Sequence, residues 1–420
     1  MTAVLRPVAA LLLATAILVM GSGLIGVLVP LRGELEGFGP IAIGGFGGSY
    51  YAGLMAGCIV APRVIGRVGH IRAFAAATAL VAIAPLIMAL WVEPFTWCVL
   101  RIFQGMCFAT LFMVIESWLS DATTTQTRSQ VLAIYSIVHL TVSTIGMQLI
   151  SPGRIGSFEL FSLVAILFSL AAVPVALTRS LAPAPPRPVA LGFARLLAIS
   201  PTALAGVAFA GLSNSATWTM TTVFGKGLGL DAQNSAILLA LIVLSGAVAQ
   251  WPVGFASDKL GRRPVLITLT GLAAVACGGI VQAGVTDHAM LFVSAIVFGG
   301  ASFAIYPVCV AHANDLIPRE QAVETSGGLL LLFSLAAVAG PLLASVFMSV
   351  WGYWSLFLFL GVAHLLLAPV LLVRVSQRPT LPTADKDDFV LVARTTPAMF
   401  ELDPRAEPAE EDPHRVAPTA

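Results

Sequence analysis

Long stretches without a single charged residue are the feature of this sequence that most limits its fold. Nine such stretches run for about twenty residues or more, and a tenth, residues 325–373, is roughly twice that length. A helix that crosses the hydrocarbon core of a bilayer needs about 20 apolar residues. Only 10% of the chain is charged, whereas soluble domains carry about 25%. The sequence therefore predicts a protein that crosses a lipid bilayer many times.

The spans predicted in this way number twelve. The nine uncharged stretches are residues 8–31, 37–62, 73–92, 129–153, 160–178, 196–225, 232–257, 264–286 and 289–314. Residues 325–373 divide into two spans at Trp351–Trp354, and residues 95–119 add one span that contains Arg101 and Glu116. A glycine among interfacial aromatic residues suits a turn at the membrane surface. We expect an all-α membrane protein with twelve transmembrane helices in two six-helix pseudo-repeats.

Changes in composition divide the chain into four parts. Residues 179–195 contain four prolines and are predicted to be a semi-extended cytoplasmic linker. Six spans precede it in residues 1–178, and six follow in residues 196–375. Residues 376–420 are rich in proline and acidic side chains, a composition typical of disorder. We expect two six-helix bundles, a linker and a disordered cytoplasmic tail.

The two halves also repeat weakly in sequence. At nearly one offset, Gly66 matches Gly261, Gly105 matches Gly300 and Asp121 matches Asp315. Parallel repeats of this kind are one known plan for transporters, with the substrate held between the halves near the middle of the membrane.

The basic residues predict the orientation of the chain. With the N-terminus inside, the inner loops carry most of the Lys and Arg residues, and the outer loops carry only Arg32, Arg154 and Lys226. Loops on the cytoplasmic side of a membrane are enriched in Lys and Arg. We therefore expect both termini to be cytoplasmic.

The segment that follows the eighth predicted span carries the most specific motif. It reads Gly254-Phe-Ala-Ser-Asp258-Lys-Leu-Gly261-Arg262-Arg263. Asp258 suits a helix N-terminus, Gly261 a tight turn, and the arginines an acid on a neighbouring helix, for which Asp315 is our candidate. This pattern resembles the signature of the major facilitator superfamily, in which the cluster acts as a latch between conformations. The resemblance covers about residues 8–375.

The first half departs from this pattern. Pro62 stands where the superfamily has Asp, while Arg63 and Arg67 are retained in the predicted loop. Glu116 and Asp121 are the acids available to bind these arginines. The segment that begins at Pro62, the end of the fourth span and the tail around residues 394–404 resemble the YcaD-like branch, which implies a bacterial inner membrane location.

Arg101 and Gly105 resemble the superfamily's R-x-x-x-G motif, which implies a role in proton coupling or substrate handling. An arginine inside a membrane helix costs at least about 2.5 kcal/mol on insertion scales. The alternative is an arginine that extends to the membrane surface. Glu116 lies about 22 Å further along the helix axis, so it does not pair with Arg101. Pairing of Glu116 with a loop arginine and a protonatable coupling site are both open, and His139 can also titrate near neutral pH.

Several other polar or aromatic side chains within the spans are candidates to line a cavity. Asn214 and Trp218 lie four residues apart and share one helix face. The remaining candidates are Tyr50, Tyr51, Gln148 and Tyr306.

These features favour a secondary transporter of a small organic solute, with protons as the candidate coupling ion. A sensor or scaffold that kept the transporter fold without transport is the alternative. The sequence contains no Walker motif, nucleophile elbow or metal-ligand spacing, and its five cysteines form no C-x-x-C. We therefore expect no enzyme activity, cofactor or metal. A net charge of +1 also argues against a nucleic-acid partner.

Overall fold

A computed structural model describes residues 8–124, 127–177, 183, 192–284, 286–318, 321–377 and 395–402. Within these ranges the chain is helical and contains no strand. Eleven of the described helices are long and apolar enough to cross a membrane, and a bent pair of helices adds a twelfth span. The predicted all-α membrane fold is confirmed.

The helices form two groups along the chain. The first group is α2 (Ala9–Leu35), α3 (Pro40–Val68), α4 (His70–Leu90), α5 (Pro94–Asp121), α6 (Arg128–Met147), α7 (Glu159–Leu170) and α8 (Ala172–Ala176), with the 3-10 turn η1 (Pro152–Arg154). The second group is α9 (Phe193–Ile199), α10 (Pro201–Gly227), α11 (Ala232–Leu260), α12 (Arg262–Ala283), α13 (His288–Asn314), α14 (Ala322–Trp351) and α15 (Ser355–Gln377). A short 3-10 helix, η4 (Pro397–Leu402), follows in the tail.

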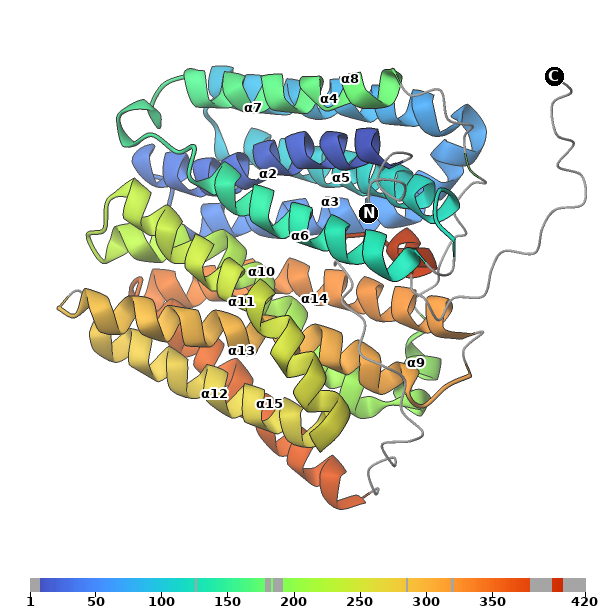
Figure 1. Cartoon of the computed structure of the whole chain (residues 1–420). Helices are drawn as coiled ribbons and strands as arrows, with labels where there is room; N and C mark the ends of the chain where they lie inside the picture. Colours follow the sequence, from blue (N-terminus) through green and yellow to red (C-terminus); the bar gives the residue numbers. More distant parts are fainter. Residues whose placement is uncertain are drawn as a thin grey trace, which may run out of the picture.

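The two groups form two layers (Figure 1). Helices α2–α8 make the upper layer, and α10–α15 make the lower one. The layers meet where α14 and α10 pack on α3, α10 packs on α2, and α11 packs on α6. We call the end of the bundle that carries α9 and the turns after α3 and α11 the basic side, and the other end the opposite side.

The seventh span begins later than predicted. We expected it at residues 196–225, but residues 193–199 form the separate helix α9, bent by 119° from α10. Ser200 between them is extended, as is favoured before Pro201, and its hydroxyl caps α10 by accepting a bond from the Ala203 backbone N–H. The predicted linker therefore also loses its last residues to a helix.

The motif residues assigned to loops lie mostly on helices. Gly254 and Asp258 belong to the end of α11, and Arg63 and Arg67 belong to α3. Gly261 alone separates α11 from α12, with φ of 97°. Such a backbone favours glycine because a side chain is strained there. The helices thus extend beyond their apolar stretches, since their internal hydrogen bonds do not require lipid.

The positions of the glycines also change which residues of the two halves correspond to each other. Gly69, with φ of 83°, separates α3 from α4 as Gly261 separates α11 from α12. Gly69, rather than Gly66, is therefore the structural partner of Gly261. A Cβ on Gly105 would lie 2.2 Å from the Tyr50 carbonyl oxygen, and one on Gly299 would lie 2.1 Å from that of Ile242. Gly299, rather than Gly300, thus corresponds to Gly105 at this helix crossing.

Glycines on α3 let the two layers touch near the opposite side. A Cβ on Gly44 would lie 2.4 Å from the Ser345 Cβ on α14, and one on Gly47 would lie 2.4 Å from the Thr219 hydroxyl oxygen on α10. Small residues permit such close helix approach in membranes. The layers are therefore closed against each other at this end.

Part of the tail is ordered, contrary to the expectation of disorder. Residues 395–402, which we call the tail segment, pack against α5, α6 and α14. Met399, Phe400 and Leu402 are buried, and burial of such side chains stabilises an ordered conformation. Residues 378–394 and 403–420 lie outside the described residues.

Candidate functional site

A cavity of about 190 Å³ lies between the two layers. Most of its wall comes from the first group of helices, and the tail segment contributes Thr395. The lining residues are Ser22, Ile25, Gly26, Val29, Pro30, Phe46, Gly47, Tyr50, Tyr51, Leu54, Arg101, Phe108, Phe112, Ser136, His139, Leu140, Ser143, Asn214, Trp218, Thr219, Gln250, Phe333 and Thr395. An apolar wall with a few polar groups is typical of a small-molecule site.

Arg101 is the single formally charged side chain among the described residues of this wall. Its guanidinium lies 4.5 Å from the centre of the Tyr50 ring, in a cation–π arrangement. Its Nη1 donates to Gln104 Oε1 at 3.2 Å, and its Nε donates to the Phe46 carbonyl oxygen at 3.4 Å. Arg101 thus lines the cavity, and its neighbours there are neutral groups that position it without cancelling its charge.

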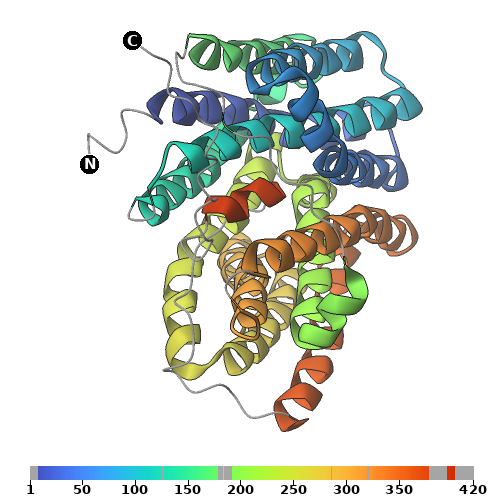
Figure 2. The same cartoon turned by 90° about the vertical axis from the view of Figure 1, so that its right-hand side faces the viewer.

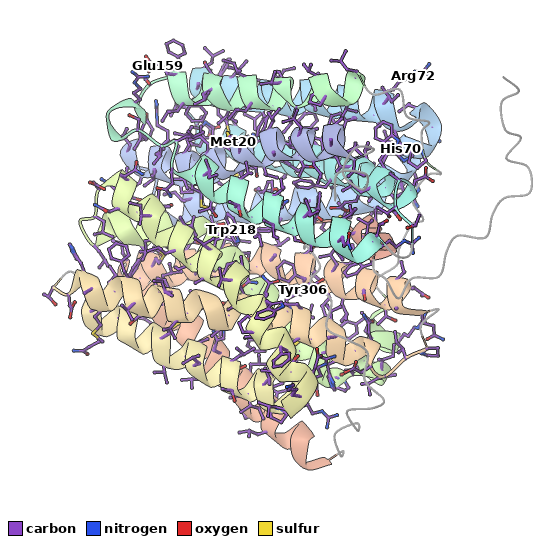
Figure 3. The ribbon with its side chains drawn as sticks, in the orientation of Figure 1. Met20, His70, Arg72, Glu159, Trp218 and Tyr306 are labelled. Carbon is purple, nitrogen blue, oxygen red and sulfur yellow. The ribbon has the colours of Figure 1, made fainter. Side chains whose placement is uncertain are left out.

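Four more of the predicted cavity residues, together with His139, line the same cavity. Tyr50 and Tyr51 on α3 have ring centres 5.5 Å apart. His139 on α6 lies against Phe112, with ring centres 5.4 Å apart. Asn214 and Trp218 line it from α10, and Figure 3 shows Trp218 where the two layers meet.

Two predicted cavity residues lie elsewhere. Gln148 caps the end of α6 and accepts a hydrogen bond at 2.9 Å from Gln233 on α11, so it joins the two layers near the opposite side. Tyr306 is buried within the second group, with its ring centre 5.0 Å from that of Phe333 (Figure 3). Their spans were identified, but a helix has several buried faces, and the sequence does not say which of them meets the cavity.

Glu116 is fully buried near the basic side of α5. Its carboxylate accepts a hydrogen bond from the Tyr135 hydroxyl at 2.9 Å. The hydroxyls of Thr395 and Thr396 in the tail segment donate to its two oxygens. The expected binding of Arg63 is not seen: Arg63 instead donates to the Ile59 carbonyl oxygen of its own helix. The carboxylate thus holds part of the tail, and no feature of the sequence predicts this contact.

The charged cluster of the second half has the geometry expected from its motif. Arg262 donates from Nε to Asp315 at 3.0 Å and also binds Asp258. Arg262 Nη1 reaches the Ser257 hydroxyl at 2.8 Å. Arg263, the next residue, is buried as well. The cluster ties the junction of α11 and α12 to the end of α13.

Among the described residues of the first half, the positions that correspond to Asp258 and Arg262 carry neither an acid nor an arginine. Because Gly69 corresponds to Gly261, Gly66 stands at the position of Asp258 and His70 at that of Arg262. The His70 ring lies 5.9 Å from that of Trp118 at the end of α5. His70 thus contacts Trp118 at the position from which Arg262 binds Asp315, and the charge of Asp121 acts on its ring. This revises the sequence interpretation, which placed the departure at Pro62.

A contact between the layers marks the opposite side. The Tyr353 hydroxyl, in the turn between α14 and α15, donates to Glu34 Oε1 on α2 at 2.6 Å. This hydrogen bond, followed by partial burial, raises the pKa of Tyr353 to about 12. Together with Gln148–Gln233, it fastens the two groups of helices at this end.

Some cavity residues were missed in the sequence. Gln250 is a polar residue inside an apolar span and was detectable by that contrast. Phe46, Phe108 and Phe333 gave no signal, because aromatic residues are common in any apolar helix. Thr395 lay in a segment whose composition predicts disorder.

Comparison with protein families shows what the chain is similar to. The model of the Major Facilitator Superfamily matches residues 203–402. The match covers most of the second group of helices and the tail segment, so this part of the chain is similar to the major facilitator superfamily. Relatives of the whole chain include the uncharacterized MFS-type transporter YcaD of Escherichia fergusonii, 24% identical over 345 residues that cover 82% of this chain and 89% of the relative. The YcaD of Salmonella arizonae is 24% identical over 376 residues, covering 89% and 97%.

Solved structures of several transporters share the fold. A nucleoside transporter, NupG, superposes with a TM-score of 0.74 at 13% identity, covering 89% of this chain and 100% of that one. A bacterial homolog of the human lysosomal transporter Spinster gives 0.71 at 16% identity, covering 90% and 97%. A D-xylose–proton symporter gives 0.70 at 12%, covering 91% and 100%. At these identities the likeness concerns the fold alone.

Proposed function

We propose that this chain is a member of the major facilitator superfamily and a secondary active transporter of a small organic solute that works by alternating access. The observation that carries the proposal is the cavity between the two layers, lined by side chains of both and by one arginine. Residues 1–178 and 196–375 would be the two bundles that rock around it. The proposed setting is a bacterial inner membrane with the basic side in the cytoplasm, since loops rich in Lys and Arg stay there.

The charge of the cavity favours a solute with one acidic group. Arg101 brings a positive charge into a wall that, over its described residues, has no Asp or Glu. A buried charge is stabilised when an opposite charge joins it. The tyrosines, phenylalanines and Trp218 offer faces for an apolar or ring-shaped body. A cavity of about 150 Å³ holds a benzene ring, so 190 Å³ suits a compact molecule.

The proposal includes the coupling of transport to protons. His139 and Arg101 line the cavity, while Glu116 lies at its basic-side end. The Arg262 cluster is proposed to latch the second bundle, with Gly254 allowing close helix approach and Asp315 as the acid. Arg63 and Arg67 are proposed to stabilise the basic surface of the first bundle.

Arg101→Gln tests the solute site directly. Purified protein is screened for thermal stabilisation by small organic monoanions and their neutral amide analogues, and each hit is then assayed for uptake into proteoliposomes. We expect the wild type to be stabilised by acids rather than amides, and Arg101→Gln to lose about tenfold or more in affinity, because a charge-assisted bond contributes about 1.5–3 kcal/mol.

Arg72→Gln is the matched control, since Arg72 lies on the exposed surface at the start of α4 and does not line the cavity. It should bind and transport as the wild type does. Hits that bind Arg101→Gln with unchanged affinity would refute the anion site, and a ligand that binds without being transported would favour a sensor.

A sensor or scaffold without transport remains the second candidate. The observation that favours it is the tail segment packed between the bundles, which is how a fold that no longer moves would be held. Uptake by the intact chain excludes this candidate.

A further inference from the structure

The tail segment occupies the basic-side end of the cavity. Figure 2 views this side and shows η4 at the centre of the face, between the two layers. The segment packs on α5 and α6 of the first group and on α14 of the second. Thr395 is itself part of the cavity wall. A single short stretch of chain therefore bridges both groups and bounds the cavity.

Buried side chains and specific hydrogen bonds hold the tail segment in its position. Thr396, Met399, Phe400 and Leu402 are each at most 1% exposed. The hydroxyls of Thr395 and Thr396 both donate to the buried Glu116 carboxylate. Hydrogen bonds to an ionised acceptor are about twice as strong as neutral ones. The apolar side chains and the two hydroxyls together fix residues 395–402 at this place.

Over the residues that the structure describes, the cavity has no open exit at the opposite side, and this makes the position of the tail segment important for access. At the opposite side the layers touch through Gly44 and Ser345, and through Tyr353 and Glu34. The cavity is therefore closed there, and a solute would have to leave past the tail segment.

We propose that residues 395–402 are a built-in plug that closes the basic-side mouth of the cavity and is latched onto Glu116. In this arrangement Glu116 is a positioning residue for the plug. Exchange of solute at this side requires the segment to leave. Residues 378–394, 17 in number, connect it to α15 in the sequence.

The test measures access to the cavity and does not depend on the solute. A reporter cysteine replaces Ser136, which lines the cavity on α6, and its reaction with a bulky maleimide is timed in the purified full-length protein. A parallel protein without the reporter corrects for the native cysteines. Thr395→Val together with Thr396→Val should speed labelling about tenfold or more, because two bonds to a charged acceptor are lost. Ending the chain after residue 394 should speed it at least as much.

Two controls match these changes. Ending the chain after residue 402 keeps the plug, and Thr395→Ser with Thr396→Ser keeps both hydroxyls, so each should label at the wild-type rate. An excess of a synthetic peptide of residues 393–404 should slow labelling of the chain that ends at residue 394. Unchanged labelling of that shortened protein in a folded state would overturn the proposal. Failure of the shortened protein to fold would also count against a plug, since it would make the segment part of the core.

Discussion

At the scale of single residues, the buried ion pair between Arg262 and Asp315 is the interaction whose loss we expect to cost the most stability. Both side chains are almost inaccessible, at 2% and 1% exposure. Removing one partner of a buried pair leaves a charge without its counter-charge and commonly costs about 3–5 kcal/mol. We expect Asp315→Asn to destabilise the protein by about 3 kcal/mol, measured as thermal unfolding in detergent.

Asp258→Asn provides the comparison for this prediction. Asp258 binds the same arginine but is 30% exposed, and exposed pairs contribute about 0–1 kcal/mol. Equal losses in the two variants would show that burial does not decide the strength of the cluster.

The candidate site shows where prediction from single residues ends. Arg101 and His139 were identified because charge and titratable groups are rare in apolar helices. Tyr306 contacts Phe333 of the cavity wall but does not itself line the cavity, because burial within one bundle and burial at a cavity look alike in sequence. Thr395 could not have been found, since its contact with Glu116 spans 279 residues of sequence.

At the scale of elements, α3 is specialised for contact with the other layer. Gly44→Ala would place a Cβ 2.4 Å from that of Ser345, so α3 and α14 must separate. Overpacking of this kind costs about 1–3 kcal/mol, and here the cost falls on the state that is closed at the opposite side. We expect a cysteine at Val29 in the cavity wall to be labelled about fivefold faster or more from that side.

Gly45→Ala is the control for this change. It adds the same methyl group to the adjacent residue, where the nearest atom is the Cys98 Sγ at 3.4 Å. Its labelling should match that of the wild type. A rate as fast as that of Gly44→Ala would mean that any larger residue on this helix opens the layers.

The ends of elements were predicted less well than their existence. Apolar length reveals where a helix must cross lipid, and all the expected spans have a helical counterpart. It does not reveal that α3 and α11 continue into the basic surface, because water and lipid both tolerate a helix whose backbone is satisfied internally.

At the scale of the whole molecule, the two layers are fastened at the opposite side by Tyr353 and Glu34. The pKa of Tyr353 is raised from about 10 to about 12. The stabilising effect of the tyrosine is therefore complete below pH 10 and is lost as the pH rises through 12. We expect the melting temperature of the wild type to approach that of Tyr353→Phe as the pH rises through this range.

The difference between the two proteins isolates this contact from other groups that titrate at high pH. A difference that stays constant from pH 8 to pH 12 would show that the hydroxyl does not titrate as its contact with Glu34 requires. Accessibility of the Val29 cysteine in Tyr353→Phe provides a second measurement, since a weaker fastening favours opening at the opposite side.

Because the tail segment belongs to the same chain as the cavity, its concentration at the cavity mouth does not depend on the amount of protein. Because the plug is tethered to the bundle that it closes, it is present at an effective concentration in the millimolar range, whatever the abundance of the protein. Closure is then a first-order event that is identical in sparse and crowded membranes. A free molecule that competes for the same mouth must exceed this local concentration, or bind much more tightly, to keep the cavity open.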